Sequence, residues 1–286
     1  MITRRCTQRQ FLLRPDELTN RNFLYCLAEA ANRYNIRILF TLANSNHHHT
    51  GIYDAKGNYP AFIEHFHKML AKCQNARFGR WENFWASEQT SVVRLVDKED
   101  VLDKMVYALT NPVKDHLVER AHHWPGVSSR RENLSGEPML AERPRKFFRA
   151  QGGMPQKVRL ELGRPPAYEH LTRAEFAALL EERITRAEKE AAEERRKRGI
   201  RVLGRAAVLA QSWQSSPQSI APRRGLSPRV AAKSRWSRIE ALQRLEAFVR
   251  AHRAAWQAWK GGVRDVLFPA GTYWLVHFAG VECATE

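Results

Sequence analysis

The amino-acid sequence predicts an α+β fold, an antiparallel sheet with helices on one face, joined to a mainly helical and basic C-terminal region. Three observations predict it. Before residue 130, apolar patterns follow the order strand, helix, hairpin, helix, strand, helix. A stretch rich in Pro, Gly, Ser and Arg comes next, and two long helical patterns follow that stretch. We therefore expect a first domain over residues 1–130, a linker over 131–171 and a C-terminal region over 172–286.

The first half of the first domain contains a strand, a helix and a hairpin. Residues 1–10, rich in Thr and Arg, resemble a strand. Apolar side chains at three- and four-residue spacing then predict a helix over about 18–34. The apolar run 36–42, a polar turn and the segment 47–53 predict two paired strands.

The second half of this domain adds two helices and a strand. We expect a helix over about 60–77 and a strand over 91–96. A third helix should begin after Asp97, a favourable N-cap residue. It should end at Asn111, because the following Pro112 disfavours helical geometry in the residue before it.

Two long helices and a terminal hairpin are expected in the C-terminal region. Thr172 and Glu175 have the spacing of a capping box, which predicts a helix over 172–198. Its second half is charged nearly all round, so we expect it to project into solvent. Another helix is predicted over 234–260, and the stretch 265–278 resembles a hairpin.

Composition points to a polyanionic partner. Lys and Arg number 47 against 30 Asp and Glu, a formal net charge of +17, and nucleic acid is the first candidate for such a chain. The four cysteines are scattered, which argues against a disulfide framework or a cysteine zinc site. No apolar run reaches the length of a membrane span, so we expect no membrane partner and a cytoplasmic protein, associated with the nucleoid when bound to DNA.

The run His47-His48-His49 opens the second strand of the predicted hairpin. Side chains alternate along a strand, so His47 and His49 share one face and could hold a divalent metal, while His48 points away. A surface histidine run and a pair of hydrogen-bonded polar residues are the alternatives. His65 and His67 have the same spacing on a predicted helix, where they diverge and cannot bind one ion.

Tyr107 and Asn111 lie four positions apart on the third helix, and hence on one face. By itself, a helical tyrosine is more often a packing residue than a nucleophile.

Together the two motifs resemble those of a known family. The stretch from Asn46 to His49 resembles the His-hydrophobic-His (HUH) motif of the single-tyrosine transposases, especially the REP-associated tyrosine transposases, which are related to the small insertion-sequence transposases. The stretch from Tyr107 to Val113, read as Y-x-x-x-N-P-V, resembles the catalytic helix of that family. The resemblance covers about residues 1–129 and implies an HUH endonuclease fold with a ferredoxin-like core.

The resemblance also implies the chemistry. His47, His49 and Asn111 would bind Mg²⁺ or Mn²⁺, and Tyr107 would attack a DNA phosphate, leaving a 5′-phosphotyrosine link and a free 3′-hydroxyl. The expected activity is that of a metal-dependent single-tyrosine DNA transposase, a strand-transferring endonuclease that cleaves and rejoins single-stranded or hairpin DNA in transposition and recombination. It would act as a monomer or a homodimer.

Two other functions remain open. One is a non-catalytic, domesticated DNA-binding protein on the same fold. The other is a metal-dependent hydrolase in which the histidines activate water and Tyr107 only orients it. The strand also departs from the family pattern, because His48 stands where an apolar side chain is usual. His48 could therefore cost stability in the core or compete as a ligand in a shifted register.

Several basic and aromatic residues are candidates for DNA contact. Aromatic rings can stack on bases and arginines can hold phosphates, although the same aromatics could simply close the sheet edge. The candidates are Arg4, Arg5, Arg80, Trp81 and Trp85. The basic C-terminal region is expected to add further DNA affinity.

Overall fold

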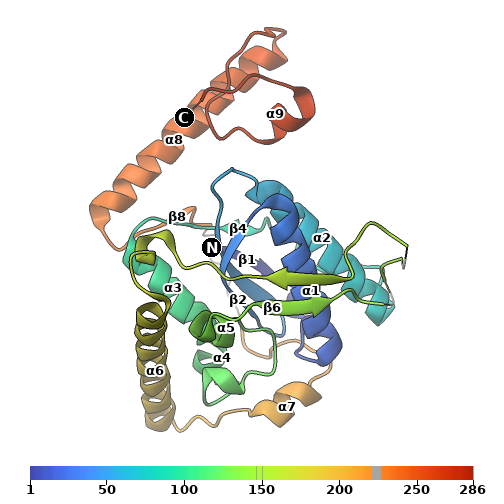
Figure 1. Ribbon diagram of the computed structural model, residues 1–286, viewed down its shortest axis with the longest axis vertical. Coiled ribbons are helices and arrows are strands. Elements are labelled where there is room, and N and C mark those ends of the chain that lie inside the picture. Colours follow the sequence, from blue (N-terminus) through green and yellow to red (C-terminus); the bar gives the residue numbers. More distant parts are fainter. Residues whose placement is uncertain (146, 150, 221–226, 286) are drawn as a thin grey trace.

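The computed structural model describes residues 1–145, 147–149, 151–220 and 227–285. Its centre is a four-stranded antiparallel sheet in the order β2-β3-β1-β4 (Figure 1). The four strands are β1 (Ile2–Arg5), β2 (Arg37–Ala43), β3 (His47–Tyr53) and β4 (Ser91–Val92). The predicted α+β class with an antiparallel sheet is therefore confirmed.

Helices cover both faces of this sheet, so the expectation of helices on one face is wrong. α1 (Glu17–Tyr34) and α2 (Tyr59–Phe78) share one apolar core with Ile2 and Ile38. On the other side, α3 (Lys98–Leu109) shares a second core with Leu42 and with α6 (Arg173–Arg198). The sequence pattern shows that each helix has an apolar side but not which face of the sheet that side meets.

The bounds of the first helices agree with the predicted ones to within a residue or two, but the third helix ends early. α3 ends at Leu109, and Thr110 separates it from the short helix α4 (Asn111–Lys114). Pro112 occupies the first turn of α4, where a missing N–H costs no hydrogen bond. The predicted end at Asn111 is therefore wrong, because the proline starts a new helix.

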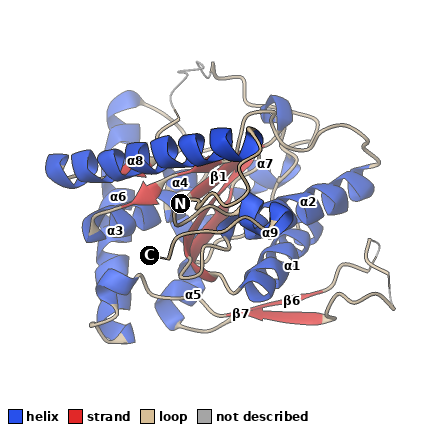
Figure 2. Ribbon diagram, turned by 90° about the horizontal axis from the view of Figure 1, so that it is seen from above, coloured by secondary structure: helices blue, strands red, loops and turns tan. Residues whose placement is uncertain are grey.

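Residues 131–171 are not an irregular linker. They contain most of α5 (Arg130–Ser135), the antiparallel pair β6 (Met139–Glu142) and β7 (Lys157–Leu160), and the 3-10 helix η3 (Pro166–Tyr168). β6 and β7 pack along α1, and the hydroxyl of Tyr25 donates to the Pro155 carbonyl at 2.7 Å (Figures 1 and 2). The division into domains predicted above stays a prediction.

The second half of α6 is partly buried, which corrects the expectation that it projects into solvent. Glu188 accepts the backbone N–H of Ala121 at 2.7 Å, and Arg195 donates to the Val113 carbonyl at 3.2 Å. Glu188 thereby satisfies a buried backbone N–H of the 3-10 helix η2 (Ala121–His123). Arg195 in the same way satisfies a backbone carbonyl of α4. The capping box of Thr172 and Glu175 is present as predicted.

The C-terminal segment stands apart from this body. α8 (Arg235–Lys260) buries only Ala241 and Ala255 along its length (Figure 1). Its start is held to α3, since the backbone N–H groups of Lys233 and Ser234 donate to Asp100 and Asp97, each at 3.0 Å.

The predicted terminal hairpin is wrong, because α9 (Trp274–Ala279) forms in its place. Its aromatic side chains follow a helical spacing, with Tyr273 stacked on His277 and Trp274 on Phe278. The remaining short elements are η1 (Thr7–Arg9), β5 (Arg94–Leu95), η2 (Ala121–His123), α7 (Arg205–Ala210) and β8 (Val230–Ala231).

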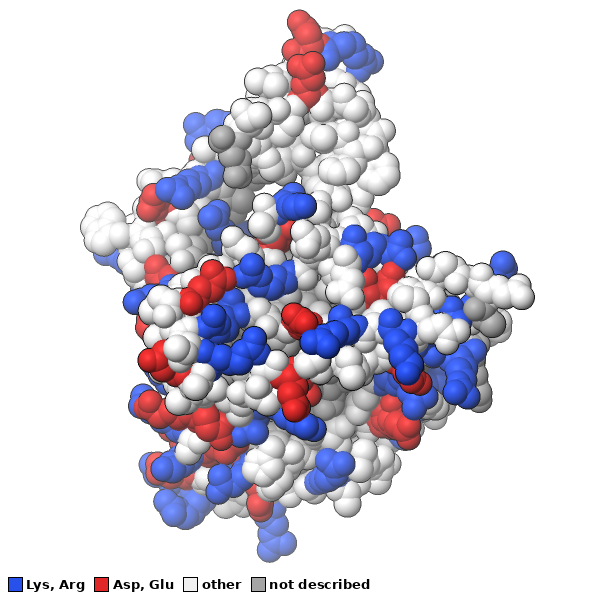
Figure 3. Space-filling model, viewed as in Figure 1, with Lys and Arg blue, Asp and Glu red and all other residues white. Residues whose placement is uncertain are grey.

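Charges of both signs are interspersed over the face seen in Figure 3, without one continuous basic area. The net charge of +17 therefore does not by itself mark a binding surface on this face. All four cysteines are free, as the scattered spacing predicts. Among the described residues, no helix combines the length and the apolar character needed to cross a bilayer.

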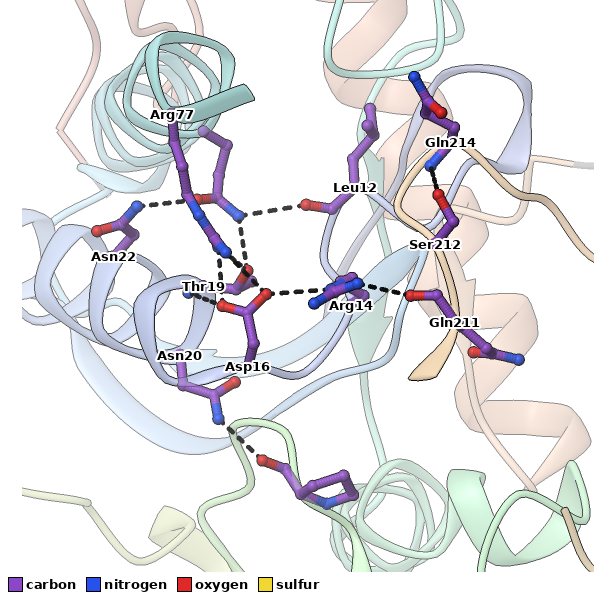
Figure 4. Close-up of polar contacts among 12 residues, drawn as sticks. Leu12, Arg14, Asp16, Thr19, Asn20, Asn22, Arg77, Gln211, Ser212 and Gln214 are labelled. Atoms are coloured by element: carbon purple, nitrogen blue, oxygen red, sulfur yellow. Dashed lines mark hydrogen bonds and ion pairs between the residues drawn. The ribbon is translucent and has the colours of Figure 1, made fainter. Parts of the chain in front are cut away.

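An ion-paired cap joins α1 to α2 and so fixes the helical layer beneath β3. Asp16 caps α1 by accepting the N–H of Thr19 at 2.8 Å, and Arg77 of α2 donates to the same carboxylate at 2.9 Å (Figure 4). Burial alone would raise the pKa of Asp16, but the hydrogen bonds from Arg77 and Thr19 outweigh it and hold the pKa below its usual value. Arg14 links this cap to the Gln211 carbonyl.

Candidate metal and nucleophile site

Strand β3 places His47 and His49 on the same face, with 4.9 Å between their ring centroids. Each ring is oriented through Nδ1. Asn46 Oδ1 lies 2.7 Å from Nδ1 of His47, and Thr3 Oγ1 lies 2.9 Å from Nδ1 of His49. A carboxamide oxygen can only accept, so Nδ1 of His47 carries the proton and Nε2 offers a lone pair. Partners of this kind orient metal-binding imidazoles in proteins.

The break between α3 and α4 brings Tyr107 and Asn111 to the same place. The Tyr107 ring lies 5.7 Å from the His49 ring, centroid to centroid, and 39% of the tyrosine is exposed. Asn111 is buried and accepts from Nδ2 of Asn44, which also contacts His47. Strand and helix thus bring together the four residues proposed from sequence as ligands and nucleophile, although their chemical roles stay predictions.

Asn44 joins the two halves of the site, and sequence reasoning missed it. Its Nδ2 donates to Nε2 of His47 at 3.0 Å and also to Oδ1 of Asn111. Asn44 lies in the turn between β2 and β3, where a polar residue looks like ordinary turn chemistry. The only available signal was its position three residues before His47 in so short a turn.

Electrostatics keep the imidazoles neutral. Burial lowers the pKa of His47 well below its usual range, and the neighbouring His49 and Arg5 lower it further. Burial and the Lys104 ammonium lower the pKa of His49 to about 4. Near neutral pH both rings therefore keep the lone pairs that a metal needs.

The Tyr107 phenol is protonated under the same conditions. Burial raises its pKa above the usual value and the Asp115 carboxylate raises it further, while a hydrogen bond with Asn111 opposes the shift. Its ionisation therefore has to be assisted by positive charge near the oxygen.

The donor atoms fit a divalent cation. Nε2 of His49 and Oδ1 of Asn44 are buried without a hydrogen-bond partner, which is costly unless another group uses them. Two imidazole nitrogens and the amide oxygen of Asn111 form a mixed N and O set that suits Mn²⁺ and accepts Mg²⁺. Among the described residues, no cluster of three or more His, Cys, Asp or Glu side chains offers an alternative site.

His48 lies on the opposite face and has a structural role. Its Nε2 is 2.9 Å from Nε2 of His67, and its Nδ1 is 3.1 Å from Thr50 Oγ1. Phe23 and Phe66 pack against its ring. With both nitrogens engaged and its ring in the core, His48 does not compete as a ligand in a shifted register.

His65 and His67, the pair with the same spacing on a helix, diverge as expected. His67 points to His48, whereas Nε2 of His65 lies 2.7 Å from a Glu29 carboxylate oxygen. The two rings therefore have different partners and share no ion site.

The five DNA-contact candidates separate into two groups. Arg5 pairs with His47 in the strand register, is exposed and lies on the site face. Trp81 is 95% exposed, so its ring is free to meet a base.

Arg4, Arg80 and Trp85 are engaged inside the protein, which argues against the predicted DNA contacts. Trp85 is buried, and its indole donates to the His67 carbonyl at 2.9 Å. Arg4 faces the same side, with its guanidinium 6.0 Å from the Trp85 ring. Arg80 donates to Gln10 at 3.1 Å. Strand alternation puts Arg4 on the face opposite to the histidine site, and the aromatic loop closes the sheet edge with Trp85.

No family model matches the chain, and no curated protein matches it. A solved structure of a REP-associated tyrosine transposase bound to a REP hairpin is similar, with 16% sequence identity and a TM-score of 0.35. The likeness covers 52% of this chain and 80% of that one. At so low a TM-score, the function has to be inferred from the chemistry of the chain's own site.

Proposed function

We propose that this chain is a metal-dependent, single-tyrosine DNA strand transferase that cleaves and rejoins single-stranded or hairpin DNA. The observation that carries the proposal is the contact between the half-exposed Tyr107 ring and His49, with 5.7 Å between the centroids. A nucleophile beside two neutral imidazoles and an amide oxygen has the parts that phosphodiester transfer needs.

The covalent step exchanges one phosphorus–oxygen bond for another. The phenolic oxygen of Tyr107 attacks the phosphorus and loses its proton, while the bond to the 3′ oxygen breaks and that oxygen takes up a proton. The product is a 5′-phosphotyrosine and a free 3′-hydroxyl. Because the new bond retains the energy of the old one, the 3′-hydroxyl of another strand can reverse the attack and join the ends without ATP.

The other residues hold the reacting groups in place. His47, His49 and Asn111 would hold Mg²⁺ or Mn²⁺, which supplies positive charge to the non-bridging oxygens of the phosphate. Nδ2 of Asn44 donates to Nε2 of His47 and to Oδ1 of Asn111, the same atoms that would hold the metal, so the Asn44 amide would give up these hydrogen bonds when the ion binds. Thr3 and Asn46 orient the imidazoles from behind.

The test is to incubate the full chain with Mn²⁺ and a labelled single-stranded DNA hairpin, and to look for a denaturant-resistant protein–DNA adduct. We expect an adduct that Tyr107→Phe abolishes. Tyr53→Phe is the matched control, because Tyr53 is also 39% exposed and lies at the far end of β3. Strand cleavage that persists without an adduct in Tyr107→Phe would indicate the hydrolase instead, and DNA binding without cleavage would indicate the non-catalytic binding protein.

We further propose that each chain carries a complete site, because Tyr107 contacts His49 of its own chain. Mixing Tyr107→Phe with His49→Ala protein tests this. No adduct should form in the mixture if the tyrosine acts in its own chain. Recovery of the adduct would show that two chains exchange the tyrosine helix.

A further inference from the structure

Two lysine ammonium groups lie close to the ring of the partly exposed Tyr107. Nζ of Lys104 lies 5.7 Å from the centre of the Tyr107 ring, and Nζ of Lys114 lies 5.1 Å from it. Lys104 comes from α3, one turn before the tyrosine, and Lys114 comes from the end of α4, two turns after it. The tyrosine ring thus has one ammonium group near it from each side of the break at Thr110.

Neither ammonium forms an ion pair or a hydrogen bond with any residue in the described part of the chain. The neighbouring carboxylate, Asp103, is taken by Arg183 and Lys233 instead. Many other cations on helices of this protein are paired, as Arg186 is with Glu182. Two unpaired positive charges beside one half-exposed phenol are therefore available to an anion from outside.

The two lysines differ in what lies beside them. Lys104 is only partly exposed and lies on the same helix as the nucleophile. Lys114 follows Asn111 by three residues and is more exposed to solvent. An ammonium is a compact point charge that suits phosphate oxygens.

We infer that Lys104 and Lys114 form a phosphate-binding pair around the nucleophile. Lys104 binds the phosphate that Tyr107 attacks, and Lys114 binds a neighbouring phosphate of the same single strand. The inference rests on the proposed function and adds to it two substrate-binding residues outside the ligand set. Lys104 acts on the charge that develops as the phosphorus–oxygen bond breaks, while Lys114 holds the strand in register.

The experiment compares Lys104→Gln and Lys114→Gln with Lys98→Gln. Lys98 is an exposed lysine at the start of the same helix, so its substitution removes the same charge far from Tyr107. Binding is measured with a fluorescent mixed-sequence single-stranded oligonucleotide over a range of salt concentrations. Adduct formation is measured in a single turnover with a labelled single-stranded DNA hairpin. Gln is a good helix former, and thermal unfolding checks that each variant is folded.

We expect Lys104→Gln to slow adduct formation by about tenfold or more, with a smaller change in affinity. Lys114→Gln should weaken binding severalfold and reduce the salt slope by about 0.7, the value for one lost contact to a single strand. Lys104→Arg and Lys114→Arg, which keep the charge, should recover most of each loss.

Results that match Lys98→Gln in both measurements overturn the inference. The failure of the proposed function looks different. In that case the unchanged chain forms no adduct with the hairpin. The salt dependence of oligonucleotide binding in Lys104→Gln and Lys114→Gln then still shows whether the two lysines bind phosphates.

Discussion

The two faces of β3 put the same side chain into opposite chemical situations. On one face His49 has a buried Nε2 without a partner, next to Tyr107. On the other face His48, the preceding residue, is fully enclosed and uses both nitrogens. His49 keeps one nitrogen that no neighbour uses and His48 keeps none, so the partners decide the role of each of these two rings and the residue type does not.

This difference follows from what packs on each face. Phe23 of α1, Phe66 of α2 and Trp85 of the loop after α2 enclose His48 and leave no access. The opposite layer ends in the break between α3 and α4, which leaves Tyr107 half exposed. We therefore expect substitutions on the face of β3 that carries His49 to change activity and to leave the free energy of unfolding nearly constant. Substitutions on the opposite face, which carries His48 and packs on α1 and α2, should change the free energy of unfolding and leave activity nearly constant.

The largest expected effect is on activity, in His49→Ala. Loss of partners behind a metal ligand already costs about 10- to 100-fold in activity or metal affinity. Loss of the ligand itself should therefore lower Mn²⁺-dependent adduct formation by at least about 100-fold. Single-turnover assays and Mn²⁺ titration by calorimetry measure the two effects. An unchanged Mn²⁺ affinity in this variant would exclude His49 as a ligand.

The second effect is on stability, in His48→Ala. Removing the ring leaves a cavity and deprives the buried His67 of its partner, which together should cost about 2–4 kcal/mol in the free energy of unfolding. Denaturant unfolding measures this loss. The double variant His48→Leu/His67→Leu removes both partners, and we expect it to recover much of the loss while the adduct rate of the folded protein stays within about twofold. A large loss of adduct rate in that double variant would contradict the separation of the two faces.

Much of this arrangement could be predicted from local patterns. The alternation along 47–53 put His47 and His49 together, and the spacing of Tyr107 and Asn111 put those two on one side. Both predictions treat the two residues as members of one element, although Thr110 separates Tyr107 on α3 from Asn111 on α4. Their meeting across two elements came from the family resemblance, because no pattern in one chain tells which face of a sheet a helix will cover.

Other features could not be predicted from the sequence, and the reasons are physical. Strands β6 and β7 are four residues each, too short for alternation to stand out in a stretch rich in Pro and Gly. Arg195 and Trp85 donate to backbone carbonyls that lie far away along the chain. The sequence alone therefore gives no sign that the Arg195 guanidinium and the Trp85 indole have partners inside the protein. Asn44 acts through two side chains that only the folded hairpin and α4 bring to it.

A smaller effect is expected from the C-terminal helix. Most of α8 lies away from the core, and Arg235, Arg238 and Arg253 form no ion pair with any described residue. Replacing these three by Gln should weaken the binding of single-stranded DNA severalfold and lower the salt slope, at an unchanged adduct rate. Arg244→Gln is the control, because Arg244 is paired with Glu240. Equal affinities for the triple variant and the control would remove α8 from the DNA-binding surface.

The smallest effect concerns the helix face and depends on pH. The pKa of Asp16 is held below its usual value by Arg77 and the Thr19 N–H, so the folded state favours the carboxylate. The resulting stability is present above the pKa of the unfolded state and is lost as pH falls through the lower pKa of the folded state. Because the pair is partly solvated, we expect it to contribute no more than about 1 kcal/mol to the free energy of unfolding.

Asp16→Asn should therefore be less stable than the unchanged chain at pH 7, and the difference should shrink toward pH 3. Urea unfolding at the two pH values measures it, and a difference that stays constant would show that Asp16 acts as a neutral cap without help from its charge. Adduct formation at pH 7 should be unaffected, since this ion pair lies beneath the face of β3 that carries His48.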